Sequence, residues 1–525
     1  MSDINDECDA WSSGESEGDS ITSDDDIFEI NDDDLHYLPG EEIFYDNHFY
    51  PSIKDFIGSG SSISEDAPLN GNKPINYFQL FFDDFLLDLI VQETNIYQNQ
   101  NPEPVRQKMA AWVDVTREEL KKFLGLTILM GHLKKISLED YWSTNPLLVT
   151  PIFPQTMHRN RYNQILRYLH FHNNQVVMNH PLKKVKVIID NLNAKFSRFL
   201  KPGKKMCIDE SLLLWKGRLK FKQYIPLKRH RFGIKLFEHV DCSSGYILSF
   251  IVYTGADTDY EKFGLGISGD IVAHFLKPYF GKGHVIYIDN WYSSAPLSVF
   301  LHEKETGVCG TVRKNRKGLP NFKTPLKKGE SEVAHNNLWM VVRWFDKKEV
   351  YMITTVHEFN YAETGKQEYT TGANILKPTC IIDYNKNMGG VDNVDRQLAL
   401  SESVRKSTRW YKKLFFHLVD LSLINGHALY KLHQEKTSFS SFRMKIIAGL
   451  LGIEKITPAF IQPPPLRLVG RHFPACGETK KRCYMCSLEK KRKESKYCCK
   501  KCNVALCVVP CFEKYHTLGN LTDII

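Results

Sequence analysis

Apolar positions recur at helical spacing once the first 70 residues have passed. A run from residue 75 predicts one amphipathic helix. Its apolar positions are Phe78, Phe81, Phe82, Phe85, Leu86, Leu89 and Ile90. Thr116 with Glu119 forms a capping-box pattern that begins a second helix. A third, around residues 156–172, has a basic face that fits either DNA phosphates or ordinary solvent. Residues 75–203 are therefore predicted to form a helical dimerisation or DNA-binding domain.

The pattern changes at Met206, where short apolar or β-branched runs follow one another. They predict a strand at 206–208, a hairpin formed by 232–240 and 246–254, a helix at 271–276, and strands at 285–288 and 307–312. A hairpin followed by strands and helices is the order of an RNase H-like α/β core. The predicted fold class is thus a multidomain α/β protein with an RNase H-like catalytic core.

The predicted core also sets the expected domain boundaries in the rest of the chain. Residues 204–313 are its first part, and a mainly β insertion at 314–378 contains the strand-like runs WMVVRWF and EVYMITTV. Helical sequence resumes at Asn387, so 379–430 are predicted as the helical second part. Residues 431–458 are predicted as a helical continuation of the DNA-binding domain. Pro463–Pro465 mark a stiff linker at 459–470.

Charge is distributed unevenly along the 525 residues. Residues 1–66 contain 20 acidic residues and one lysine, so the net charge of +8 leaves +27 on the remainder. We expect residues 1–70 to be a disordered acidic tail and the body to attract a polyphosphate, although basic residues can also be a simple solvated surface. No apolar run approaches the roughly 20 residues of a membrane span, and the acidic N-terminus lacks the basic and apolar regions of a signal peptide. We therefore expect neither membrane insertion nor secretion.

Four aspartates are the candidate catalytic residues. Asp209 and Asp289 each close a predicted buried strand, and Asp392 and Asp395 stand three apart near a helix start. Carboxylates gathered at strand ends can hold two Mg²⁺ ions for phosphodiester chemistry. Any one of them could instead be a turn residue or a helix cap. The pattern favours a nuclease or transposase.

Cysteines concentrate near the C-terminus, where eight of 13 fall between Cys476 and Cys511. Paired spacing there is typical of tetrahedral zinc sites rather than disulfides. We predict two Zn²⁺ ions within a cysteine-rich zinc domain at residues 471–521. The eight expected ligands are His472, Cys483, Cys486, Cys499, Cys502, Cys507, Cys511 and His516. Cys498 leaves the choice beside Cys499 open.

Several motifs together resemble the piggyBac transposase family, and in particular its transposable element-derived protein 4-like members. They are DESLLLWKGRLKFKQYIPLKRHRFGIK, YIDNWYSS, GTVRKNRKGLP, IDYNKNMGGVDNVD and the cysteine-rich end, in collinear order over about residues 75–520. The resemblance implies a DDE/D recombinase in which Asp209, Asp289 and Asp392 are the catalytic carboxylates and Asp395 an additional acid. It implies two Mg²⁺ or Mn²⁺ ions, hairpin intermediates and joining to TTAA targets.

The resemblance also implies partners and a location. They are double-stranded DNA, a second copy of the chain, a C-terminal cross-brace zinc domain that recognises transposon ends, and the nucleus. Cross-braces also occur in ubiquitin ligases and histone readers. A domesticated DNA- or chromatin-binding protein without catalysis is the alternative function.

Basic side chains near the predicted core are the candidate DNA contacts, although each could equally be a surface charge. They are Lys216, Arg218, Arg229, Arg231, Arg313, Lys317, Arg405, Lys406 and Arg409. An aromatic side chain close behind Asp289, Trp291 or Tyr292, could stack on an unpaired base, but packing against the core is the favoured interpretation.

Overall fold

The chain forms two compact units, residues 1–454 and 455–525, which are described separately. In this computed structural model, the described residues are 43–102, 111–225, 231–369, 372–403, 409–433, 437–453 and 466–518. Three predicted DNA contacts, Arg229, Arg405 and Lys406, lie outside these ranges.

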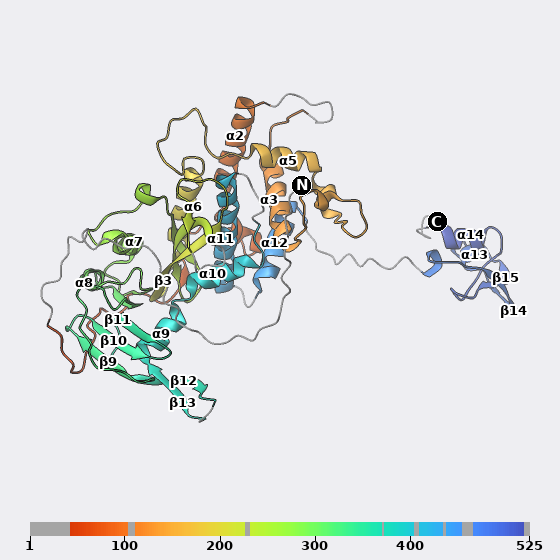
Figure 1. Ribbon diagram of the computed structural model, residues 1–525. Helices are drawn as coiled ribbons and strands as arrows, with labels where there is room; N and C mark the ends of the chain where they lie inside the picture. The colour runs from red at the N-terminus through yellow and green to blue at the C-terminus, as the bar shows by residue number, and fades with distance from the viewer. Residues whose placement is uncertain are drawn as a thin grey trace, which may run out of the picture. The chain divides into compact units, whose positions relative to one another are not determined.

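A nine-stranded mixed sheet is the core of the larger unit (Figure 1), with the order β4-β5-β3-β7-β8-β11-β10-β9 and β6 also paired to β5. β3 pairs antiparallel with β5 and parallel with β7, and β7 is parallel to β8. The strands are β3 (Lys205–Leu214), β4 (Gln223–Tyr224), β5 (Phe232–Asp241), β6 (Ile247–Val252), β7 (Val285–Ile288), β8 (Gly307–Thr311), β9 (Ser331–His335), β10 (Met340–Phe345) and β11 (Glu349–Thr354). A hairpin joined to parallel strands confirms the predicted α/β class.

Strand β3 is longer than its sequence pattern predicts. The expected strand ended at the acid, but Asp209 lies in the middle of a ten-residue strand. Strand β7 has the bounds predicted from its apolar run, and its last parallel pair joins Ile288 to Ile208. Asp209 therefore lies just beyond the point where the neighbouring strand stops.

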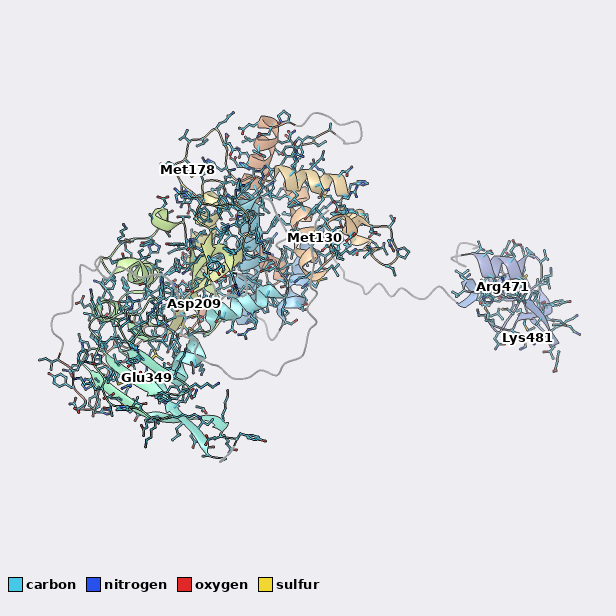
Figure 2. All side chains as sticks on the ribbon, in the orientation of Figure 1. Met130, Met178, Asp209, Glu349, Arg471 and Lys481 are labelled. Carbon is cyan, nitrogen blue, oxygen red and sulfur yellow. The ribbon has the colours of Figure 1, made fainter. Side chains whose placement is uncertain are left out.

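The β insertion continues the core sheet instead of folding apart from it. β11 pairs antiparallel with β8, and β10 and β9 follow outward. Within the described part of the insertion, β12 (Tyr361–Gln367) and β13 (Asn374–Pro378) form a separate hairpin. Figure 2 labels Asp209 within the sheet and Glu349 on the strands that extend it.

Helices pack against this sheet on both faces. They are α7 (Gly266–Leu276), α8 (Ala295–Glu303), α9 (Thr379–Asn387) and α10 (Gly390–Ala399). α10 contacts β3 and β5, whereas His239, which follows Glu238 on β5 and therefore points to the other face, lies against Phe275 of α7. Helical structure resumes at Thr379, earlier than the expected Asn387, and the Gly389 turn then separates α9 from α10.

The remaining helices form a bundle around α11. They are α1 (Pro74–Gln79), α2 (Asp84–Gln100), α3 (Arg117–His132), α4 (Ile152–Thr156), α5 (Arg159–Tyr168), α6 (Lys186–Phe199), α11 (Trp410–His433) and α12 (Phe439–Leu451). Short 3₁₀ turns occur at Glu139–Trp142, Gly255–Asp257, Lys277–Tyr279 and Leu466–Leu468. α12 packs against α3 and α1, so sequence from both sides of the core meets in one bundle. None of the described helices has the length and apolar character needed to cross a bilayer.

The first predicted helix is in fact two helices. Asp83 interrupts it, because its side chain accepts a hydrogen bond from the Leu86 amide at 2.9 Å and caps α2. Phe85, expected on the apolar face, is 66% exposed. Half of the predicted capping box is present: the Glu119 amide donates to Thr116 Oγ1 at 3.3 Å, whereas the Glu119 carboxylate accepts from Arg161.

A fully buried ion pair ties the bundle together. The Arg443 guanidinium on α12 lies 3.8 Å from Asp420 on α11 and donates to the Ile128 carbonyl of α3 at 3.1 Å. Asp420 also accepts from the Ser403 amide at 2.8 Å, just after α10. Both charged side chains are fully buried, so each depends on the other for compensation.

Ordered structure begins well before residue 75, which corrects the predicted tail at 1–70. Tyr45 pairs with His335 at the outer strand β9, and Phe49 is buried. β1 (Ser62–Ile63) then pairs with β2 (Leu200–Lys201). Residues 43–70 therefore run along the larger unit, and the tail prediction falls on residues 1–42, outside the described part.

The smaller unit has a three-stranded sheet and two short helices. They are β14 (Pro474–Arg482), α13 (Tyr484–Leu488), β15 (Glu494–Cys499), β16 (Val504–Ala505) and α14 (Cys511–Thr517). Its small buried cluster consists mainly of cysteines with Met485 and Leu506. So little apolar burial is consistent with a fold that depends on metal.

Candidate functional site

Three carboxylates meet where β7 ends beside β3. One oxygen each of Asp209, Glu210 and Asp289 lies within 4.8 Å of the others. Backbone amides fix two of them: Glu210 N donates to Asp209 Oδ1 at 2.8 Å, and Trp291 N donates to Asp289 Oδ1 at 2.9 Å. The structure thus brings together two predicted acids and adds Glu210, which the sequence analysis missed.

The local electrostatics favour a cation at this cluster. Burial, followed by the nearby charge of Glu210, raises the pKa of Asp289 to about 7. Burial also raises the pKa of Tyr292 well above its usual range, with contributions from the same acids. Glu210 Oε2 is a buried oxygen with no hydrogen-bond partner among the described residues. Oxygen ligands held this closely are what a divalent cation needs, so the donor set fits the expected Mg²⁺.

The other two predicted acids lie on α10. Ser211 Oγ on β3 donates to Asp395 Oδ1 at 2.6 Å, which holds Asp395 against the strand that carries Asp209. Asp392 is an exposed residue in the first turn of α10. Neither belongs to the cluster within 4.8 Å, and their catalytic roles stay predictions.

Cationic side chains surround the loop after Asp289. Arg316 Nη2 donates to the Trp291 carbonyl at 3.0 Å, and Arg313 Nε to Asn290 Oδ1 at 3.4 Å. Lys235 Nζ lies 4.7 Å from the Trp291 ring. Arg313 is therefore beside the acid cluster, and Arg316 and Lys235 were not predicted.

Trp291 packs in the way its favoured interpretation predicts. Its ring stacks on Phe237 with centroids 5.5 Å apart and an interplanar angle of 16°. The remaining described DNA candidates, Lys216, Arg218, Arg231, Lys317 and Arg409, are exposed and stay predictions.

Asp383 anchors α9 to the sheet beneath the acids. It accepts hydrogen bonds from Lys205 Nζ of β3 at 2.5 Å, from the Tyr287 hydroxyl of β7, and from Asn387 Nδ2 at 3.0 Å. His357 Nε2 lies 3.2 Å from Asp383 Oδ2, the oxygen that also accepts from the Tyr287 hydroxyl. Burial opposes ionisation, but bonds from His357, Lys205 and Tyr287 hold the pKa of Asp383 well below its usual range. The helix leading to Asp392 is thus attached to both acid-bearing strands.

The eight predicted zinc ligands divide into two sets of four. Cys483, Cys486, Cys507 and Cys511 form one set; His472, Cys499, Cys502 and His516 form the other. The sets alternate along the chain, which is a cross-brace. Cys498 belongs to neither, which resolves the ambiguity in favour of Cys499.

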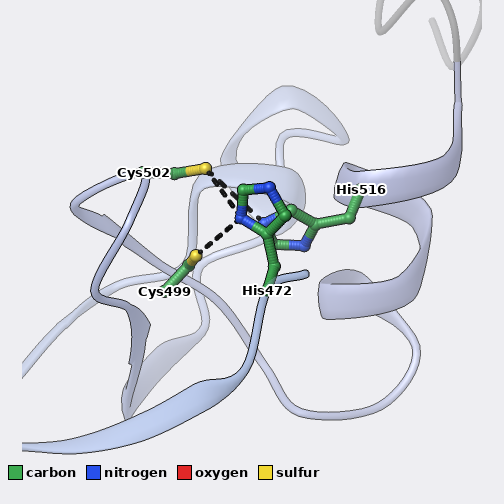
Figure 3. Close-up of side chains that lie close together, drawn as sticks. All are labelled: His472, Cys499, Cys502 and His516. Carbon is green, nitrogen blue, oxygen red and sulfur yellow. Dashed lines mark hydrogen bonds between the residues drawn. The ribbon is translucent and has the colours of Figure 1, made fainter. Parts of the chain in front are cut away.

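Distances within each set fit tetrahedral zinc. Cys486 Sγ lies 3.9 Å from Cys507 Sγ and 3.6 Å from Cys511 Sγ. Zn–S bonds of about 2.3 Å require S···S edges of about 3.8 Å. In the other set, His472 Nδ1 is 3.3 Å from Cys499 Sγ and 3.4 Å from Cys502 Sγ (Figure 3).

Backbone carbonyls orient both imidazoles. His516 Nδ1 lies 2.7 Å from the Phe512 carbonyl, leaving Nε2 toward Cys502 at 3.7 Å. His472 Nε2 lies 3.2 Å from the Val469 carbonyl, leaving Nδ1 toward the thiols. Such contacts fix the tautomer of a metal-binding histidine. In the other set, burial disfavours the thiolate form of Cys483, but hydrogen bonds from the backbone amides of Cys486 and Cys507 lower the pKa of this thiol to about 7.

The known proteins that are similar to this chain are transposases and proteins derived from them. A family model described as Transposase IS4 matches residues 73–427, more than half of the chain. Human PiggyBac transposable element-derived protein 3 is 26% identical over 469 residues, covering 85% of this chain and 76% of that protein. The chain belongs to the piggyBac-type transposase family.

Other members of the piggyBac-type family are similarly distant. Human PiggyBac transposable element-derived protein 2 is 25% identical over 385 residues, covering 70% of this chain and 63% of that protein. The structure of a piggyBac transposase synaptic complex with hairpin DNA has a TM-score of 0.64 and 24% identity, covering 86% of this chain and 98% of that one. This likeness shows the shared fold.

Proposed function

We propose that this piggyBac-type transposase is catalytically competent. It excises a DNA element by cut and paste through hairpin intermediates and integrates it at TTAA, by metal-dependent phosphoryl transfer. The observation that carries the proposal is the convergence of Asp209, Glu210 and Asp289 within 4.8 Å. A chain that only bound DNA would gain nothing from gathering partly buried carboxylates that repel one another.

The chain's residues have distinct roles in this proposal. Asp209 and Asp289 hold the cations, with Glu210 beside them and Asp392 and Asp395 supplied by α10. Two Mg²⁺ ions would activate the attacking oxygen and stabilise the leaving oxygen. Arg313 and the other cations around the Asp289 loop attract and orient the phosphate backbone.

The cysteine-rich unit supplies recognition of transposon ends. Its two four-ligand sets support two Zn²⁺ ions, and basic residues such as Lys481, Lys493 and Lys500 favour DNA over a positively charged histone tail. A homodimer would hold two transposon ends together. The nucleus is the proposed location, because chromosomal DNA is the substrate.

Cleavage of labelled DNA tests the proposal. The substrate is a duplex carrying the terminal repeats that flank the coding sequence and a TTAA site, incubated with Mg²⁺. Wild type should yield nicked and hairpin products, and Asp289→Asn should lose them while still binding DNA. Asp257→Asn, an exposed aspartate in a 3₁₀ turn, is the control and should cleave normally.

The domesticated alternative predicts a different outcome. Wild type and Asp289→Asn would then bind the duplex equally, and neither would cleave it with Mg²⁺ or Mn²⁺. That result would refute the proposed catalysis and leave a DNA-binding protein.

A further inference from the structure

Glu238 on β5 is a buried acid without a partner beside the proposed metal centre. Its side chain is fully buried, and both carboxylate oxygens lack a hydrogen-bond partner among the described residues. Burying a carboxyl group that has no hydrogen-bond partner is strongly unfavourable. An apolar residue would be the stable choice here, so the carboxyl requires an explanation.

The pairing of β3 with β5 places Glu238 on the same face of the sheet as Asp209. Glu238 is directly opposite Asp209 across the β3–β5 ladder. Residues paired in this way share one face of the sheet, with Cβ atoms about 5 Å apart. Ser211 is on that same face of β3, two residues after Asp209, and binds Asp395. Glu238 therefore lies under α10 on the face of the sheet that carries Asp209 and Asp395, next to the group of three acids within 4.8 Å and not inside it.

The groups that act on Glu238 provide no positive charge. Burial is the main cause that raises the pKa of Glu238 well above its usual range. The charge of Asp395 and then the thiol of Cys207 raise it further. None of these described neighbours is cationic. A buried water could satisfy one oxygen, but it would leave the repulsion between the carboxylates uncompensated. A divalent cation supplies both the missing ligand contact and the missing charge.

We propose that Glu238 is a further acid of the metal centre and ligates a second cation together with Asp209 and Asp395. The first cation is held by Asp209, Glu210 and Asp289, so Asp209 is the carboxylate shared by the pair. This inference rests on the proposed function, because it assigns a ligand to the metal pair that the function requires.

Titration of the full-length, zinc-loaded protein with Mn²⁺ tests the assignment. The signal of free Mn²⁺ in electron paramagnetic resonance gives the number of bound ions and their dissociation constants. Thiolate zinc sites are poor Mn²⁺ sites, so they do not interfere. Wild type should bind two ions, whereas Glu238→Gln should bind one with unchanged affinity and the second at least about tenfold more weakly.

A control and a second variant separate ligation from folding. Glu363→Gln, an exposed glutamate on the β12–β13 hairpin, should bind two ions like wild type. Glu238→Met, an apolar side chain of similar length, should melt at a higher temperature than wild type without Mn²⁺ and gain less from Mn²⁺. A residue with only a packing role would gain as much from Mn²⁺ as wild type does, whatever its melting temperature without Mn²⁺.

The outcomes distinguish this inference from the proposed function. Two Mn²⁺ ions bound with wild-type affinities by both Glu238 variants would overturn the role of Glu238 and leave the rest of the centre intact. Failure of the wild type itself to bind Mn²⁺ would overturn the metal centre and the proposed catalysis with it.

Discussion

Replacing Asp383 by asparagine tests whether α9 is anchored as the contacts indicate. The variant loses the ionic contact with Lys205, weakens the bond from Tyr287, and removes the charge facing His357. Charge-assisted hydrogen bonds contribute about 1.5–3 kcal/mol each when buried. The Asp383 and Lys205 side chains are 22% and 38% exposed, so solvent screening reduces that figure. We expect Asp383→Asn to lower the free energy of unfolding by about 2–3 kcal/mol at pH 7.

The pH dependence of this loss has a definite sign. The pKa of Asp383 is depressed in the folded state. Its stabilisation is therefore present above the unfolded-state pKa, about 4, and is lost as pH falls through the lower folded-state value. The difference between wild type and variant should be full at pH 7 and shrink progressively below pH 4.

Urea unfolding followed by tryptophan fluorescence at pH 7 and pH 3 measures the difference. All eight tryptophans precede the cysteine-rich unit, so loss of metal from that unit at pH 3 does not enter the signal. Asp190→Asn, which removes an exposed ion pair with Lys186, is the matched control and should change stability by less than about 0.5 kcal/mol. A variant within about 0.5 kcal/mol of wild type at pH 7, or an equal gap at both pH values, would refute the anchoring role. DNA cleavage should also slow in Asp383→Asn with DNA affinity unchanged, because α9 leads directly into α10.

Three other changes give separate tests. Cys486→Ser should reduce bound zinc from two ions per chain, measured by elemental analysis, whereas Cys498→Ser should keep both ions because that thiol lies outside both sets; equal zinc loss in the two variants would contradict the ligand assignment. Arg443→Met should destabilise the larger unit by about 3–5 kcal/mol in urea unfolding by leaving Asp420 buried and uncompensated, and adding Asp420→Leu should recover most of that loss; no recovery would exclude the charge-pair explanation. Without divalent metal, the raised pKa of Asp289 should make the free energy of unfolding fall as pH rises from about 4 to 7, by up to about 4 kcal/mol before solvent screening is taken into account. Asp289→Asn should remove most of this pH dependence when unfolding is measured across the same pH range.

Features encoded by neighbouring residues could be predicted from the sequence. β7 has its predicted bounds because a short apolar run stands between a glycine-rich turn and Asp289. The eight predicted zinc ligands could be chosen because their spacing is local, and the structure brings them together in two sets of four. The Thr116 cap is local in the same way.

Features that depend on strand register could not be predicted. Glu238 meets Asp209 only because β3 and β5 pair in one particular alignment, and the apolar pattern around Glu238 gives no sign of it. The insertion joins the core sheet through a β8–β11 pair that no local pattern specifies. The packing of residues 43–70 also depends on distant partners such as His335, while their acidic surroundings suggested disorder.

Two positions on one face of β3 place carboxylates in different electrostatic surroundings. Lys205 and Asp209 are four residues apart and therefore on the same face, separated by about 13 Å along the strand. At the first position Lys205 neutralises Asp383. At the second, Asp209 faces Glu238, and the groups acting on that glutamate are acidic or thiol. If the second group of acids had only a structural role, a lysine like Lys205 would stabilise it, so the missing positive charge is best supplied by the metal ions that the proposed reaction requires.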